Sequence, residues 1–216
     1  LELPPTGTKT TAAARAVTPP QPPQKVEPPP QGVVEKGSRS VLWSATDENE
    51  DELEFALYYR GEGETRWKLL KDKLREKFYT WDAETLADGA YYLKVVVSDA
   101  PANPPELALT GENTSDRFEV DNTPPRIDDL VAQPGSRRAE IRFTARDSHS
   151  PLKKAEYSLD AGPWLQLFPT SRTTDAPVET YLFVLTDLAA GEHTVVVRVY
   201  DQFDNAGLSK VTFTLK

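Results

Sequence analysis

Apolar and polar residues alternate with a period of two along most of the chain after position 32. Val41, Trp43 and Ala45 fall on one face of such a run, and the stretch 193–199 repeats the pattern. Successive side chains of a strand point to opposite faces, so these runs predict half-buried β-strands. One window, 67–77, could instead form a helix because Leu70 and Leu74 lie four apart, but its position between two strand patterns favours a strand.

The strand pattern occurs twice, about 100 positions apart, which is the length of a whole domain. The run 41–47 is repeated at 141–147, and the run 86–89 at 188–191. A longer motif, Val95-x-Val97-x-Asp99-x3-Asn103, returns as Val197-x-Val199-x-Asp201-x3-Asn205. The chain therefore contains two similar modules in tandem.

Each copy fits seven short strands separated by turns, the pattern of a two-sheet Greek-key sandwich. We therefore expect an all-β protein made of two tandem seven-stranded β-sandwiches. The predicted organisation is a linker at 1–32, a first sandwich at 33–121, a junction at 122–125 and a second sandwich at 126–216.

Residues 1–32 hold 9 of the 19 prolines and no aromatic residue. Such a segment cannot bury a core and favours polyproline II, so we expect a semi-rigid tether to something upstream. A proline-rich ligand for a recognition domain is the alternative. The chain has no Met, even at position 1, and we interpret it as a segment of a longer precursor.

Composition excludes several kinds of chemistry. Without cysteine the chain has no disulfide, thiolate nucleophile or cysteine zinc site. The net charge of −9 is concentrated in the first sandwich, which argues against nucleic acid as a partner. No apolar run reaches the roughly 18 residues that cross a bilayer, so we expect no membrane insertion by this segment. Only two histidines, His149 and His193, are present, and no catalytic motif accompanies them; we expect no enzyme activity.

The chain resembles fibronectin type III and bacterial immunoglobulin-like modules at several points. Trp43 lies near the end of the expected second strand, and Leu86-x2-Gly89-x-Tyr91 resembles the approach to a tyrosine corner. His193 stands where the first copy has Tyr91, which puts the corner hydrogen bond of the second copy in question. The run 120–125 resembles the junctions of large exported bacterial proteins, and the resemblance implies an extracellular, cell-surface or periplasmic location.

Acids and asparagines recur at the strand ends of both copies. In a sandwich of this topology the loops after the second and sixth strands share a pole, and the junction should pass over that pole in the second copy. Oxygen ligands converging there suit Ca²⁺, and the arrangement resembles a cadherin-like junction. The candidate ligands are Asp121, Asn122, Asp147, Asp201, Asp204 and Asn205.

In the first copy, Asp47 should likewise approach Asp99 and Asn103. The alternative for all these residues is structural, since Asp and Asn at strand ends commonly cap turns by accepting backbone N–H groups.

Aromatic residues of the first copy offer a different candidate site. Trp67, Trp81 and Tyr58 could form a platform on which sugar rings stack, or they could pack in the core and on the sheet faces. We expect a non-catalytic, adhesion-like spacer or interaction pair whose partners are upstream domains of the same polypeptide and an unknown protein or glycan. An accessory carbohydrate-binding unit of a polysaccharide-processing enzyme is the alternative.

Overall fold

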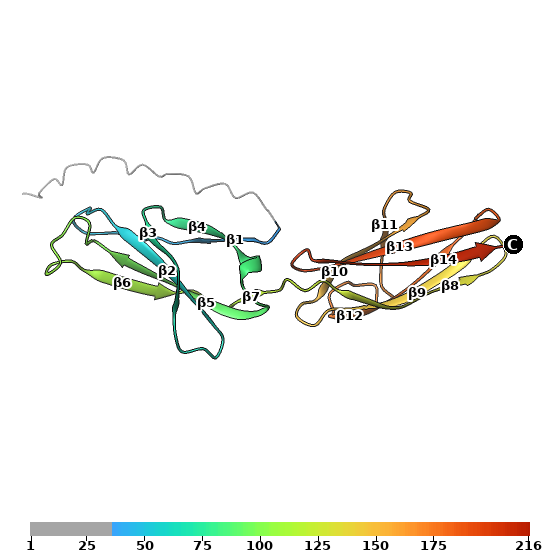
Figure 1. Ribbon diagram of the computed structural model, residues 1–216, viewed down its shortest axis with the longest axis horizontal. Coiled ribbons are helices and arrows are strands. Elements are labelled where there is room, and N and C mark those ends of the chain that lie inside the picture. The colour runs from blue at the N-terminus through green and yellow to red at the C-terminus, as the bar shows by residue number, and fades with distance from the viewer. Residues whose placement is uncertain (1–35) are drawn as a thin grey trace, which may run out of the picture. The chain divides into compact units, whose positions relative to one another are not determined.

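The computed structural model describes residues 36–216, which form fourteen strands and one short 3₁₀ helix (Figure 1). The predicted linker and the start of the first sandwich at position 33 lie outside these residues. The first seven strands are β1 (Ser38–Leu42), β2 (Glu54–Gly61), β3 (Lys68–Leu74), β4 (Phe78–Asp82), β5 (Gly89–Ser98), β6 (Thr110–Thr114) and β7 (Phe118–Val120), with the 3₁₀ helix η1 (Ala83–Thr85) before β5.

The remaining strands are β8 (Arg126–Pro134), β9 (Ala139–Arg146), β10 (Leu152–Leu159), β11 (Leu165–Leu167), β12 (Val178–Leu185), β13 (Gly191–Asp201) and β14 (Ala206–Leu215). They form a three-stranded sheet, β12-β9-β8, and a four-stranded sheet, β11-β10-β13-β14. The first seven strands form the sheets β1-β4 and β3-β2-β5-β6, with β7 also paired to β5. All of these pairings are antiparallel, so the predicted all-β fold class is confirmed; the window 67–77 contributes a strand, β3.

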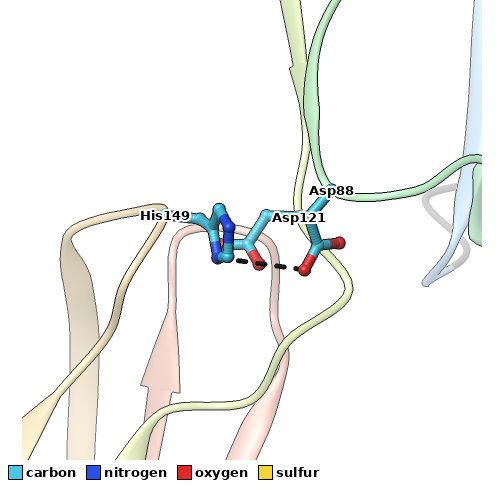
Figure 2. Close-up of side chains that lie close together, drawn as sticks. All are labelled: Asp88, Asp121 and His149. Atoms are coloured by element: carbon cyan, nitrogen blue, oxygen red, sulfur yellow. Dashed lines mark ion pairs between the residues drawn. The ribbon is translucent and has the colours of Figure 1, made fainter.

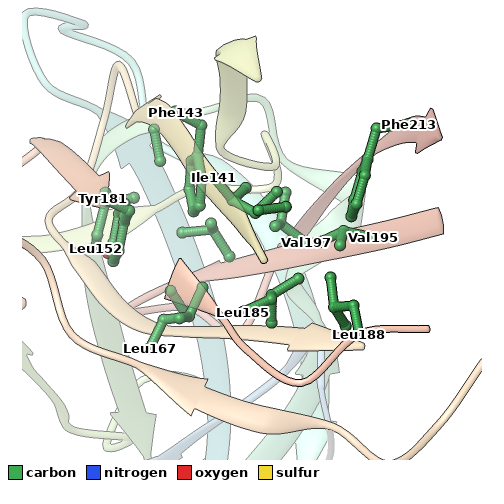
Figure 3. Packing of buried hydrophobic residues seen from close by; sticks show 14 of the residues in the cluster. Ile141, Phe143, Leu152, Leu167, Tyr181, Leu185, Leu188, Val195, Val197 and Phe213 are labelled. Atoms are coloured by element: carbon green, nitrogen blue, oxygen red, sulfur yellow. The ribbon is translucent and has the colours of Figure 1, made fainter. Parts of the chain in front are cut away.

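The second sandwich buries a continuous apolar core between its two sheets (Figure 3). The inward residues of β9 and β13 alternate as predicted, and Val195, Val197 and Val199 are fully buried. Phe143 of β9 stacks on Tyr181 of β12 with ring centroids 4.6 Å apart. Close packing of this kind makes each buried methyl group count toward stability.

The first sandwich has a smaller core, in which Phe55, Leu57 and Leu74 are buried. Val95 and Val97, the counterparts of Val197 and Val199, are only partly buried. In the second sandwich, β8 pairs with β9 and lies against β14, closing one side. Within residues 36–216, β1 pairs only with β4, and a groove of about 720 Å³ opens beside β1 and β6. The equivalent strands of the two copies therefore pair in the same order, but within residues 36–216 the first copy has no counterpart of β8, and its core is less completely covered.

The tyrosine corner is present in both copies, although one uses histidine. Tyr91 donates its hydroxyl to the Ala87 carbonyl at 2.8 Å. The His193 Nε2 lies 3.0 Å from the carbonyl of Ala189, the residue that corresponds to Ala87. The doubt that the sequence raised about this bond is thus resolved, because the imidazole reaches the same acceptor as the phenol.

His193 differs from Tyr91 in having a second polar atom. Its Nδ1 lies 2.7 Å from the Asp160 carboxylate, so both ring nitrogens face acceptors and the imidazolium form satisfies both. The bonds to Ala189 and Asp160 raise the pKa of His193 above its usual 6.5. The same histidine, with a backbone bond from Thr194, lowers the pKa of Asp160.

The duplicated valines allow the two cores to be compared directly. Val199→Ala should cost about 2 kcal/mol, because it removes fully buried methyl groups and leaves a cavity. Val97→Ala should cost less than about 1 kcal/mol, because that side chain already contacts solvent. Native-state hydrogen exchange of the β13 and β5 amides measures each sandwich separately. Equal losses at the two positions would contradict the difference in core coverage.

Histidine at the second corner should make stability depend on pH. Because the folded-state pKa of His193 is raised, its stabilisation is complete below about pH 6.5 and is lost as the pH rises through the folded-state pKa. Thermal midpoints measured between about pH 6 and pH 9 should fall for the native chain. His193→Tyr, which copies the first corner, should flatten the profile; an unchanged slope in this variant would assign the pH dependence to another group.

Candidate metal centre

Two carboxylates lie at neighbouring strand ends of the second sandwich. Asp147 follows β9, and its Oδ1 accepts the backbone N–H groups of His149 and Ser150, each at 2.8 Å. Asp201 ends β13, and its Oδ1 accepts the N–H groups of Phe203 at 2.8 Å and Asn205 at 2.9 Å. Both side chains cap their loops, so the capping role expected of strand-end aspartates is confirmed here.

In the structure the junction between β7 and β8 comprises residues 121–125, and it supplies a third carboxylate. Asp121 follows β7, and its Oδ1 accepts the Thr123 N–H at 3.0 Å. Its backbone carbonyl accepts Asn205 Nδ2 at 2.8 Å, and the same amide nitrogen donates to Asp201 Oδ2 at 2.8 Å. Asn205 therefore ties the junction to the end of β13.

The three carboxylates converge. One oxygen of each lies within 4.8 Å of one oxygen of each of the others, and the exposed fractions are 5 % for Asp121, 8 % for Asp147 and 0 % for Asp201. The Oδ2 atoms of Asp121 and Asp147 are buried and have no hydrogen-bond partner. Capping thus uses one oxygen of each of these two side chains and leaves the other unsatisfied.

The electrostatic environment of this cluster is unfavourable to bare negative charge. Burial raises the pKa of Asp201, and the neighbouring Asp121 charge raises it further. Across residues 36–216, no lysine or arginine forms an ion pair with any of the three carboxylates. Buried carboxylates are normally paired with a cation or with hydrogen-bond donors, so this cluster is suited to a positively charged ligand.

Two further side chains adjoin Asp121 (Figure 2). The His149 Nδ1 lies 3.8 Å from the Asp88 carboxylate and 2.9 Å from the Ser148 hydroxyl. Asp88 also accepts the Asn122 N–H at 2.7 Å. Sequence reasoning missed Asp88, although it lies in the repeated 86–89 motif.

Of the predicted ligands, Asp121, Asp147 and Asp201 come together. Asn205 faces this cluster with its amide nitrogen, which donates to the Asp121 carbonyl and to Asp201 Oδ2. The other two side chains point elsewhere: Asn122 donates to the Leu86 carbonyl at 2.9 Å, and Asp204 pairs with Lys153 at 2.7 Å.

The first sandwich repeats part of this arrangement. Asp47 and Asp99 approach each other as predicted, and the third carboxylate is that of Asp51, with all three oxygens within 4.8 Å. Asn103 donates to Asp51 at 3.0 Å. Asp47 and Asp51 are only partly buried, so solvent can satisfy their free oxygens.

The aromatic candidates lie in different environments. Trp67 has the Arg60 guanidinium 4.8 Å and the Lys94 ammonium 5.1 Å from its ring centre. Tyr58 is 5.8 Å from the same Lys94. Trp81 is buried and packs edge-on against Phe118. Because Trp81 is buried, the three rings do not form one exposed platform for a sugar.

A glycine fixes the path of the junction onto the second sandwich. A Cβ built on Gly207 of β14 would lie 1.8 Å from the carbonyl oxygen of Pro125. Only glycine permits this close approach of two backbones, which places the junction beside the strand ends that carry Asp201 and Asn205.

Comparisons with known proteins concern the fold. No protein-family model and no curated protein sequence matches the chain. Among solved structures it is similar to the Clostridium thermocellum CbhA fibronectin(III)-like modules, at 15 % identity and TM-score 0.41, over 84 % of this chain and 86 % of that one. It is similar to the chicken CNTN1 FN1–FN3 domains, at 11 % identity and TM-score 0.40, over 85 % and 63 %.

A third similar structure is dimeric latent PorU from Porphyromonas gingivalis, at 17 % identity and TM-score 0.41, over 79 % of this chain and 21 % of that one. No helix among residues 36–216 is long and apolar enough to cross a membrane.

The close approach at Gly207 can be tested by a single methyl group. Gly207→Ala should destabilise the chain by about 1–3 kcal/mol, because the new Cβ meets the Pro125 backbone and one of the two segments must move. The control is Gly111→Ala in β6, where the nearest atom would be Val97 Cγ1 at 3.4 Å. Urea denaturation measures both changes. A loss no greater for Gly207→Ala than for Gly111→Ala would show that the junction yields without cost.

Proposed function

We propose that the two sandwiches form a non-catalytic spacer and interaction pair within a larger exported protein. The observation that carries this proposal is the junction, whose residues are hydrogen-bonded on both sides. A spacer has to keep its modules from moving freely, and a short, pinned connection achieves this better than a flexible linker does.

The junction is held by its side chains as well as its backbone. On the side of the first sandwich, Asn122 donates its backbone N–H to Asp88 Oδ1 and its side-chain amide to the Leu86 carbonyl. On the side of the second sandwich, Asn205 donates to the Asp121 carbonyl. The two prolines that follow restrict the backbone further. Each bond is modest, and together they leave the junction few alternative conformations.

The environment of both histidines supports a non-catalytic role. His193 is engaged by Ala189 and Asp160. His149 contacts Ser148 and Asp88 through the same nitrogen, Nδ1. A catalytic relay needs the nucleophile and the orienting carboxylate on opposite nitrogens of the ring, so this group does not have that geometry.

We infer an extracellular, cell-surface or periplasmic location from the bacterial type of junction in the sequence. The partners would be upstream domains of the same polypeptide and a protein or glycan that binds the loops at the sandwich poles. Such loops can vary without disturbing the core, because the strands beneath them carry the packing.

Spin labels can test whether the junction restricts the pair. The chain has no cysteine, so Asp72→Cys on β3 and Gln166→Cys on β11 introduce two unique labelling positions. We expect a narrow distance distribution by pulsed electron paramagnetic resonance, which broadens when Asp88→Ala and Asn122→Ala remove the anchors. The control is Asp116→Ala, an exposed acid outside the junction. A distribution that is already broad in the native chain would overturn the spacer role.

A further inference from the structure

We propose that Asp121, Asp147 and Asp201 bind one calcium ion at the junction end of the second sandwich. The oxygen atoms of this cluster support a bound cation whether or not the pair acts as a spacer. Such a ligand would account for a group of charges that the fold alone does not explain.

Turn capping accounts for only part of the geometry. Asp121 and Asp147 each use Oδ1 to accept backbone N–H groups. Their Oδ2 atoms are buried without a donor, and each such atom carries the desolvation cost of an unsatisfied charged group. The Ser150 hydroxyl in the Asp147 loop is also buried and without a partner. A bound cation would satisfy the carboxylates where no protein donor does.

The donor set and its spacing favour calcium. The core of the cluster is made of carboxylate oxygens, which are hard ligands. The oxygens lie within 4.8 Å of one another, which is compatible with ligands of one ion at the Ca–O distance of about 2.3–2.6 Å. Magnesium usually keeps several waters and binds through one or two carboxylates, whereas three carboxylates converge here. The six to eight ligands that calcium takes would be completed by second carboxylate oxygens, water and neighbouring hydroxyl or carbonyl groups.

The duplication separates this cluster from an ordinary feature of the fold. Asp47 and Asp99 occupy the positions of Asp147 and Asp201 in the first copy, but their third partner is Asp51, from the same loop as Asp47. In the second copy the third carboxylate comes from the junction. A cation there would join three segments that are far apart in sequence: the junction, the loop after β9 and the end of β13.

Calorimetric titration of the chelator-treated chain with CaCl₂ tests the site. We expect one saturable binding event, weakened at least about tenfold by Asp147→Asn or Asp121→Asn, since each removes one charged ligand. Asp204→Asn is the matched control: it removes the same charge from the loop after β13, where the carboxylate is exposed and paired with Lys153. This variant should bind calcium as the native chain does.

Thermal unfolding with and without calcium distinguishes a ligand from a cap. In chelator, Asp121→Asn should be at least as stable as the native chain, because it relieves repulsion among buried carboxylates. In calcium the order should reverse, because the native chain alone gains the binding free energy. A loss of equal size in both conditions would reduce Asp121 to a capping residue and end the proposal.

Other outcomes also count against it. Absence of both heat and thermal stabilisation at millimolar calcium excludes the site. Tighter binding of MgCl₂ than of CaCl₂ contradicts the choice of ion. A calcium signal that survives Asp147→Asn unchanged belongs to another cluster, such as that of Asp47, and not to this one.

Discussion

The junction end of the second sandwich depends on the hydrogen bonds that the fully buried carboxylate of Asp201 accepts. It accepts the N–H groups of Phe203 and Asn205 and the side-chain amide of Asn205. That same amide reaches the Asp121 carbonyl, so a single charged group orders the loop after β13 and, through Asn205, the junction. Burying a charge is costly, and three charge-assisted hydrogen bonds offset only part of this cost, since burial still raises the pKa of Asp201.

This arrangement links the fold to its proposed role. Asp201 is in place because β13 alternates valines inward and ends at the sandwich pole. Gly207 then lets the junction lie against β14, and Asn122 secures the other side through Asp88 and Leu86. Core packing thus fixes the positions of the strand ends, and the side chains at those ends hold the junction in place. These contacts support the proposed spacer role.

The sequence predicted the all-β class, the duplication and the approach of Asp147 to Asp201, because these follow from strand period and topology. It could not predict where individual polar side chains point. Asp204 has φ of +64°, a left-handed turn conformation that directs its carboxylate to Lys153. His193 takes the place of Tyr91 only because its Nε2 reaches the Ala189 carbonyl. Val97 is only partly buried because it lines the groove beside β1 and β6. The alternation of apolar and polar residues does not contain this information.

The differences between the copies are more informative than their similarities. Where both copies share a residue type, as at Asp99 and Asp201, capping explains it, since each accepts backbone N–H groups of its own loop or a neighbouring one. Asp121 has no such explanation for its second oxygen, because the Thr123 N–H satisfies only Oδ1. A buried, unsatisfied carboxylate at the point where two modules join is costly to keep unless something binds it. The junction is therefore where a ligand would have the greatest effect on the pair.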